Sequence, residues 1–146
     1  MEAKAKKRQI ELFLYKSPAA GERLFLLLKR IPEKGGFWQP ITGGAEMQEE
    51  IVDCLKREAR EETGVYQINE VIDTKYQFDF SDHGHDYTEY VYGGEVGTSQ
   101  EITLSREHTE YRWVTAAEAF SLLKWPGNKE GLTRLLERLN VKDSQM

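Results

Sequence analysis

The most informative part of the chain, residues 43 to 65, reads GGAEMQEEIVDCLKREAREETGV. From about Gln48 to Thr63 its apolar residues recur at helical spacing, and Gly64 follows where a left-handed cap residue commonly ends a helix. At about 100° per residue, four apolar side chains fall on one stripe and are expected to face the core: Ile51, Val52, Leu55 and Ala59. The segment therefore predicts an amphipathic helix packed against the rest of the domain.

Three carboxylates, Glu58, Glu61 and Glu62, lie on one flank of that helix. Glu58 and Glu62 are four residues apart, so they stack on the same side, at the border of the apolar stripe. Because like charges at this spacing repel, a hard divalent cation that prefers oxygen ligands would compensate for the crowding. A solvated acidic patch is the alternative for any Glu-rich helix. The mixed-charge face opposite the stripe, which includes Arg57, is expected to meet water.

Two glycines, Gly43 and Gly44, precede the helix. Because glycine tolerates positive φ, they are expected to form a tight turn with Thr42 and to let backbone atoms approach a ligand closely. This position beside the acidic flank favours the metal-binding interpretation over the solvated patch.

The identity and spacing of these residues resemble the signature of the Nudix hydrolase family. The pattern is a Gly at 43, a Glu at 49 and then Arg57-Glu58-Ala59-Arg60-Glu61-Glu62-Thr63-Gly64-Val65, and it agrees with the signature at every specified position. So many specified positions in a short segment make the resemblance specific, unlike a single carboxylate pair. It implies an α/β (α+β) fold, a Nudix-type α/β/α sandwich with a mixed β-sheet, over one domain from residue 1 to 146.

The resemblance also implies a reaction and a division of roles. Members of the family hydrolyse a diphosphate linkage in small nucleotide-like molecules, with Mg²⁺ or Mn²⁺ as cofactor. By similarity, the metal ligands would be Glu58, Glu61, Glu62 and the Gly44 carbonyl. Arg57 would orient the carboxylates, and Glu61 is one candidate for the base that takes a proton from water, a role that varies within the family. A non-catalytic nucleotide-binding module is disfavoured, because it would be expected to lack one of the carboxylates.

Segments outside the helix bear on the substrate. Phe37 to Gly43, Glu107 to Val114 and, loosely, Trp125 to Lys129 resemble the dihydroneopterin triphosphate pyrophosphatases of the same family. In that group a loop glutamate reaches the metal site, so by similarity Glu107 is a fourth ligand or the base; a surface glutamate is the alternative. Pro40-Ile41 and Gly44-Ala45 depart from that group. Nucleoside triphosphates and dinucleoside polyphosphates of the diadenosine tetraphosphate type therefore stay open as substrates.

Four further residues are candidates for contacts with the substrate. Trp38 could stack on a planar ring or belong to the core, and Gly43 could approach the substrate through its backbone. Arg8 or Arg30 could donate charge-assisted hydrogen bonds to phosphate oxygens. The alternating aromatic residues around Phe78 are expected to pack within the sheet rather than to bind a ring.

The rest of the chain alternates between strand and helix patterns. A hairpin is expected from Ile10–Tyr15 and Arg23–Lys29, with the second strand central because its apolar residues do not alternate. Further elements are expected in the following segments: strands over 66–80, 87–96 and 111–114, a polar loop over 81–86, a helix over 116–123 behind the N-cap Thr115, a break at 126–128, and a last amphipathic helix that frays from residue 142. The predicted order is β-β-α-β-β-β-α-α.

Length and composition set the remaining expectations. The chain has 146 residues, 39% of them hydrophobic, and a formal net charge of −5. That charge argues against a nucleic-acid polymer as partner, because such binding needs many basic contacts. No apolar run long enough for a membrane span or a signal peptide is present in the sequence, so a cytoplasmic protein is expected, as a monomer or homodimer with flexible ends at 1–7 and 142–146. The lone cysteine, Cys54, is assigned no role.

Overall fold

The computed structural model describes residues 6–145, so the flexibility expected for 1–5 and 146 falls outside the described residues. In the described part of the chain, seven strands form one mixed sheet in the order β3-β2-β1-β6-β5, with β4 paired to β1 and β7 paired to β2. β1 and β6 run parallel, whereas the other pairs are antiparallel. The strands are β1 Lys7–Lys16, β2 Leu24–Arg30, β3 Trp38–Gln39, β4 Ile41–Gly44, β5 Glu70–Asp82, β6 His85–Glu95 and β7 His108–Val114.

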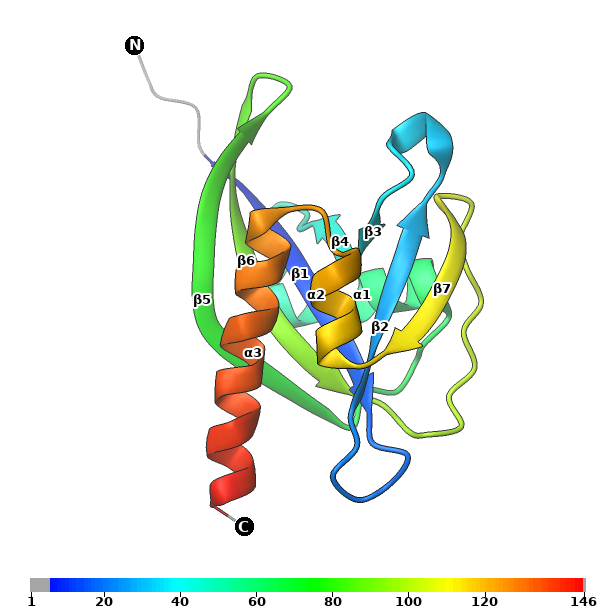
Figure 1. Cartoon of the computed structure of the whole chain (residues 1–146). Helices are drawn as coiled ribbons and strands as arrows, with labels where there is room; N and C mark the ends of the chain where they lie inside the picture. The colour runs from blue at the N-terminus through cyan, green and yellow to red at the C-terminus, as the bar shows by residue number, and fades with distance from the viewer. Residues whose placement is uncertain (1–5, 146) are drawn as a thin grey trace.

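The sheet is covered by helices on both faces, which confirms the predicted α/β/α sandwich (Figure 1). Helix α1 (Ile51–Thr63) lies behind the sheet in that view, and α2 (Ala116–Leu122) and α3 (Pro126–Ser144) lie in front. A short 3₁₀ turn, η1 (Pro32–Lys34), follows β2. None of the helices in the described part of the chain has the length and hydropathy that a membrane span requires.

The side-chain alternation of β1 divides the core into two clusters. Ile10, Leu12 and Leu14 pack with the buried face of α1 in one cluster. Phe13 and Tyr15 point to the opposite face and pack with α2 and α3 in the other. Because successive residues of a strand point to opposite faces, one fully buried strand supplies both layers.

Helix α1 begins at Ile51, three residues later than predicted, and ends at Gly64, whose φ of 72° is the expected left-handed cap. Leu55 and Ala59 are buried as predicted, but Val52 is 40% exposed. The buried stripe is instead shifted toward Cys54, which is fully buried. The stripe prediction was therefore right for the second half of the helix and wrong at Val52.

Several connections differ from the predicted ones. Ile41 to Gly44 form strand β4 rather than a turn, and neither glycine has a positive φ. Pro126 does not break the chain before the last helix but is the first residue of α3, where the absent N–H costs nothing. That helix continues through Ser144, beyond the point at which fraying was expected. The predicted polar loop after β5 is reduced to a tight turn at His83-Gly84, both with positive φ, as hairpin turns of this length require.

Strand β5 runs along α3 and is interrupted by a bulge. Its register with β6 shifts between Asp73 and Gln77, and Lys75 within this irregularity has a φ of 62°. The Asp73 carboxylate accepts a hydrogen bond from the Lys75 backbone N–H at 2.8 Å, which stabilises the bulge. Bulges increase strand twist, and beyond this one β5 stays paired with β6 from Gln77 to Asp82 as the hairpin that borders the cavity described below.

Candidate functional site

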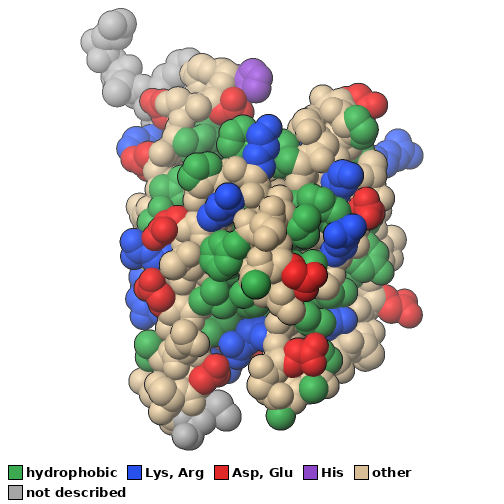
Figure 2. Space-filling view, viewed as in Figure 1, with side chains coloured by type: hydrophobic (Ala, Val, Ile, Leu, Met, Phe, Trp, Pro, Cys, Tyr) green, Lys and Arg blue, Asp and Glu red, His purple; other side chains and the backbone are tan. Residues whose placement is uncertain are grey.

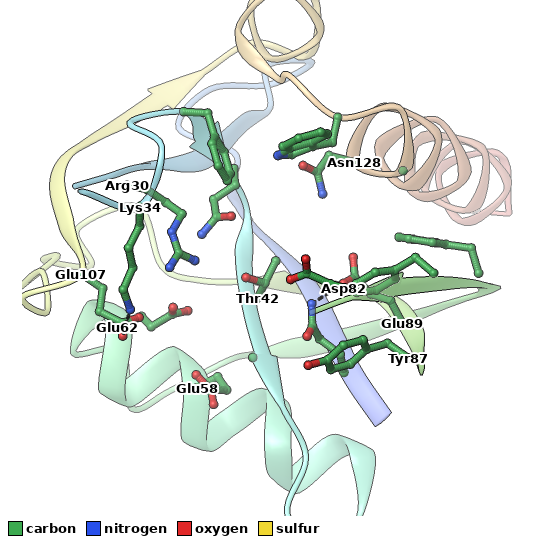
Figure 3. A pocket seen from close by; sticks show the side chains of 18 of the residues that line it. Arg30, Lys34, Thr42, Glu58, Glu62, Asp82, Tyr87, Glu89, Glu107 and Asn128 are labelled. Atoms are coloured by element: carbon green, nitrogen blue, oxygen red, sulfur yellow. Dashed lines mark hydrogen bonds and ion pairs between the residues drawn. The ribbon is translucent and has the colours of Figure 1, made fainter. Parts of the chain in front are cut away.

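A cavity of about 1030 Å³ opens between the β5–β6 hairpin and the loop that contains η1. The notch between these two arms is visible at the top of the space-filling view (Figure 2). Side chains from α1, β2 and the loop before β7 line one end, and side chains from β1, β5, β6 and α3 line the other (Figure 3). The size is that of a small-molecule site.

The α1 end of the cavity is acidic, and Glu62 is its most buried member. Only 5% of Glu62 is exposed, and its Oε2 atom is buried with no hydrogen-bond partner among the described residues. Burial, reinforced by the nearby charges of Glu58 and Glu107, raises the pKa of Glu62 to about 9. Burial also raises the pKa of Glu58. These carboxyls thus resist ionisation unless a positive charge is brought to them.

Arg57 holds the acidic end together instead of facing water, so the prediction from helix geometry was wrong for this residue. Its Nε and Nη2 atoms donate to both oxygens of Glu49 at 2.9 and 3.0 Å. Nη1 donates to Glu58 at 2.9 Å and Nη2 to the Gly44 carbonyl at 2.9 Å. The guanidinium beside it lowers the pKa of Glu49 to about 2. These contacts are consistent with the orienting role implied by the family signature.

Gly43 and Gly44 have different surroundings although they are neighbours in β4. A Cβ built on Gly43 would lie 2.5 Å from both carboxyl oxygens of Glu58, whereas one on Gly44 would meet nothing within 4 Å. Glycine at 43 is thus required by the close approach of α1 and not by a positive φ, which corrects the predicted tight turn. Gly43 lines the cavity, but Gly44 does not, and its carbonyl is engaged by Arg57.

Glu61 and Glu107 complete the acidic end from two different elements. The Glu61 side chain is 58% exposed and accepts from Arg57 at 3.2 Å. Glu107 precedes β7, and its backbone carbonyl accepts from the Ile31 N–H at 3.0 Å, which fixes it against the end of β2. Lys34 Nζ lies 2.9 Å from the Glu107 carboxylate and lowers its pKa. Glu107 is therefore ionised at the edge of the cavity.

Arg30 brings positive charge to the same end. It is the last residue of β2 and lines the cavity, and its Nε is buried without a partner among the residues the structure describes. Figure 3 shows its side chain pointing into the cavity on the side of Lys34. An anion that entered here would meet Arg30 beside the carboxylates.

The residues at this end fit a divalent cation, although they do not yet surround one. Within residues 6–145, no three His, Cys, Asp or Glu side chains stand together as a ready ligand group. The cause is visible in the ion pairs, because Arg57 engages Glu58 and Glu61 while Lys34 engages Glu107. The orphaned Glu62 oxygen and the all-oxygen donor set nevertheless suit Mg²⁺ or Mn²⁺.

Two of the predicted substrate contacts lie outside the cavity. Arg8 is not among the cavity residues and donates to the Glu46 carbonyl at 3.0 Å; its neighbour Gln9 faces the cavity instead. Trp38 is also absent from the lining and packs beside the α2–α3 cluster, with the Arg112 guanidinium 5.2 Å from its ring centre. In both cases strand alternation turns the neighbouring residue, not the predicted one, toward the cavity.

The other end of the cavity was missed by the sequence interpretation. It combines aromatic walls with buried polar side chains: Phe37, Phe78, Phe80, Tyr87, Trp125, Gln9, Glu89 and Asn128. Phe78 was expected to pack within the sheet. Its alternation with Phe80 does indicate one face of a strand, but nothing local in the sequence shows that this face borders a cavity.

Comparison with known proteins identifies a family through its domain model. The model of the NUDIX domain family matches residues 12–136. Among curated proteins, the chain is 30% identical over 115 residues to an octanoyltransferase of Myxococcus xanthus, and the match covers 77% of this chain but 32% of that protein. This chain thus spans about a third of the length of that relative. It is also 24% identical over 148 residues to dihydroneopterin triphosphate diphosphatase of Escherichia coli, covering 93% of this chain and 97% of the relative.

Solved structures agree with the architecture. A candidate NUDIX hydrolase of Listeria monocytogenes is similar with a TM-score of 0.78 and 29% identity, covering 92% of this chain and 95% of that chain. The Escherichia coli dihydroneopterin triphosphate pyrophosphohydrolase gives a TM-score of 0.75 at 24% identity and covers 94% of this chain and 99% of that chain. The second likeness, at this identity, concerns the fold alone.

Proposed function

The chain belongs to the Nudix hydrolase family, and from that membership we propose that it hydrolyses a diphosphate linkage in a small nucleotide-like substrate with Mg²⁺ or Mn²⁺ as cofactor. One observation carries the proposal. Glu62 is buried beside Glu58 and Glu107 with an oxygen that has no partner within residues 6–145, at the end of a cavity large enough for a nucleotide. Such a cluster is costly in the protein alone, and a bound cation would remove the cost.

The proposed ligands are Glu58, Glu61 and Glu62, with the Gly44 carbonyl as a further donor once Arg57 releases it. A divalent ion held by them would supply positive charge against phosphate oxygens and acidify a water molecule. Arg57 contributes by position, because its bidentate contact with Glu49 fixes the guanidinium that orients Glu58. In this proposal Arg57 does not touch the substrate.

Arg30 and Lys34 are proposed to bind the phosphate groups of the substrate. Both line the cavity, and Arg30 is already free of a carboxylate partner among the described ion pairs. An arginine can meet two phosphate oxygens at once through its planar guanidinium. Arg30 would hold a phosphoryl group at the acidic end, and Gly43 would let it approach β4 without obstruction from a side chain.

Glu107 is the proposed base among the candidates, ahead of Glu61. It lines the cavity from an element other than α1 and is ionised, and because Lys34 lowers its pKa, it would become a stronger proton acceptor if Lys34 turned to a phosphate group of the substrate. Glu62, whose pKa is raised to about 9, is a poor acceptor until a cation is bound. Glu61 also lines the cavity and is exposed to a similar degree, 58% of its side chain against 50% for Glu107, so the glutamine variants of the two residues decide between them. Lys34, paired with Glu107, would set how strongly Glu107 holds the proton.

The substrate proposal is dihydroneopterin triphosphate or a nucleoside triphosphate. The E. coli relative that acts on dihydroneopterin triphosphate is matched over nearly its whole length, which supports the first. The aromatic walls of the outer end suit any planar ring, which supports both. Dinucleoside polyphosphates are the rival, since a second nucleoside could extend through the open notch.

The test is the release of phosphate or diphosphate from a panel of these compounds and nucleotide sugars, with Mg²⁺, with Mn²⁺ and with a chelator. We expect turnover that depends on the metal ion and falls by about a thousandfold or more in Glu62→Gln. Asp53→Asn is the matched control, because Asp53 is an exposed carboxylate on the same helix, and it should keep full activity. Product identification then shows which phosphorus atom is attacked.

Two results would contradict the proposal. One is turnover that is undiminished in Glu62→Gln, and the other is no cleavage of any panel member with either metal ion. Full activity of Glu107→Gln, with Glu62→Gln inactive, would remove only the assignment of the base.

A further inference from the structure

The outer end of the cavity contains a buried amide with an unused acceptor. Asn128 is the third residue of α3, lines the cavity and is only 6% exposed. Its Oδ1 atom is buried and has no hydrogen-bond partner among the described residues. Buried side-chain oxygens rarely stay unpaired, so this one points to a group that the ligand supplies.

The orientation of the Asn128 amide is fixed by a hydrogen bond to Glu11. Its Nδ2 donates to the Glu11 carboxyl at 2.6 Å, so Oδ1 must be the atom left over. Glu11 is fully buried, and α3 lies directly on it, because a Cβ built on Gly131 would overlap the Glu11 Oε2 atom. Water therefore has no access to Glu11, and the contact with Asn128 cannot be exchanged for a solvent contact.

Glu89 supplies a second acceptor at the same end. It is 4% exposed, lines the cavity, and accepts a hydrogen bond from Gln9 Nε2 at 2.6 Å on one of its oxygens. Glu89 is also hydrogen-bonded to Glu11. Burial raises the pKa of both groups, that of Glu11 well above its ordinary value, so the shared proton lies with Glu11 and Glu89 is the accepting partner. Figure 3 shows Asn128 and Glu89 on the side of the cavity away from Glu62 and Glu107.

The walls around these acceptors are aromatic. Phe80 and Tyr87 stack at 4.9 Å between ring centres, and Phe78 stands beside Phe80 at 6.0 Å. A Cβ on Gly127 would lie 2.8 Å from Phe78, so the first turn of α3 reaches this wall only because residue 127 is glycine. Flat apolar walls with a polar edge at one end are suited to a planar heterocycle.

We propose that Asn128 and Glu89 select a planar heterocycle whose edge presents two adjacent N–H donors, a ring N–H beside an exocyclic amino group. This inference rests on the proposed hydrolysis of a nucleotide-like substrate, and it names the ring. The 2-amino-4-oxopyrimidine edge has this pattern and is shared by guanine and pterin. Adenine and cytosine pair a donor with an acceptor, so their acceptor would face an acceptor of the protein.

Binding of phosphate-free rings tests the inference without any need for hydrolysis. Guanosine is compared with inosine, which lacks only the exocyclic amino group, and with adenosine; pterin is compared with 4-hydroxypteridine, which lacks the same group. Titration by calorimetry and by saturation-transfer NMR, in chelator, gives the dissociation constants. We expect each 2-amino compound to bind about tenfold more tightly than its deamino analogue, the worth of one hydrogen bond to a buried acceptor. The two pairs show which ring is preferred.

Two variants report on the acceptors separately. Asn128→Leu removes the free acceptor and should bring guanosine and inosine within about twofold of each other. Glu89→Gln keeps the contact between Asn128 and Glu11 but can turn an amide N–H toward the cavity. Guanosine should therefore bind more weakly and adenosine more tightly than to the unaltered protein. Asn140→Leu is the control, since Asn140 is exposed on the same helix, and it should leave all constants unchanged. Thermal melting shows that each variant is folded.

The outcomes separate this inference from the proposed function. Two results overturn the inference. One is equal binding of guanosine and inosine together with equal binding of the two pteridines. The other is no detectable binding of any ring at about 10 mM, a limit near −3 kcal/mol. Preference for adenosine in the unaltered protein also overturns it. A preference for the 2-amino rings in a protein that cleaves no panel member would uphold the inference while the proposed reaction fails.

Discussion

Replacing Glu62 by glutamine should become more favourable to the stability of the metal-free protein, relative to the parent, as pH rises. Glu62 is 5% exposed, and burial raises its pKa in the folded state to about 9 from an ordinary value of 4.5. The folded state therefore favours the protonated side chain. Stability from this group is complete below its unfolded pKa and is lost as pH rises through the interval toward the folded value.

The size of the effect follows from the width of that interval. Each pH unit inside it costs about 1.4 kcal/mol, so a rise from about pH 5.5 to about pH 8 costs roughly 3 kcal/mol through Glu62 alone. Glutamine does not titrate and avoids this cost. The free energy of unfolding of Glu62→Gln minus that of the parent should thus increase by about 3 kcal/mol between the two pH values, or by roughly 10 °C in the difference of their Tm values.

The assay is thermal and urea unfolding of the parent, Glu62→Gln and Asp53→Asn in chelator at both pH values. Other groups titrate as well, but their effects cancel when the variants are compared at the same pH. Added Mg²⁺ should stabilise the parent most at the higher pH, where less work is needed to remove the Glu62 proton, and should stabilise Glu62→Gln little. Asp53→Asn should follow the parent throughout. A difference between Glu62→Gln and the parent that does not change with pH would refute the assigned burial and pKa of Glu62.

Three further substitutions address the remaining site residues. Gly43→Ala should lower turnover by about a hundredfold, because the new methyl group displaces the Glu58 carboxyl. Gly44→Ala is its control, since a methyl group there would meet open space, and similar turnover rates for the two variants would contradict the steric argument. Arg30→Ala should raise KM about tenfold in a steady-state assay, with Arg8→Ala unchanged, and an equal effect of both would mean that Arg30 holds no phosphate. Arg57→Lys should cost about 1–2 kcal/mol in urea unfolding because lysine cannot bind Glu49 with two parallel hydrogen bonds, and a fully stable variant would exclude this clamp.

The acidic end of the cavity could be predicted from the sequence because its residues are local. Glu58, Glu61 and Glu62 share one helix, and the period of an α-helix places them on one flank without any knowledge of the fold. Arg57 exposes the limit of that argument. Helix geometry predicted that Arg57 faces water, but its long side chain reaches Glu49 and Gly44. The resemblance to the family signature was therefore the better guide to its contacts.

The glycine and proline signals were ambiguous for a physical reason. Gly43 could mark either a positive φ or a close approach, and only the position of Glu58 in space decides between them. Pro126 likewise can interrupt a helix or begin one, since its missing N–H is harmless in the first turn. Each residue has two uses in folded proteins, and the sequence around it was compatible with both.

The outer end could not be predicted because it depends on contacts between distant parts of the chain. Gln9 and Glu89 meet across the parallel pairing of β1 and β6, and Glu11 meets Asn128 through the packing of α3 on the sheet. In the sequence, both glutamates resemble exposed strand residues. The two ends of the cavity thus rest on different elements, α1 with β4 at one and β1, β6 and α3 at the other. A substitution at the outer end can therefore alter which ring binds while the carboxylates keep their arrangement, so a change of ring should affect KM more strongly than the rate of the chemical step.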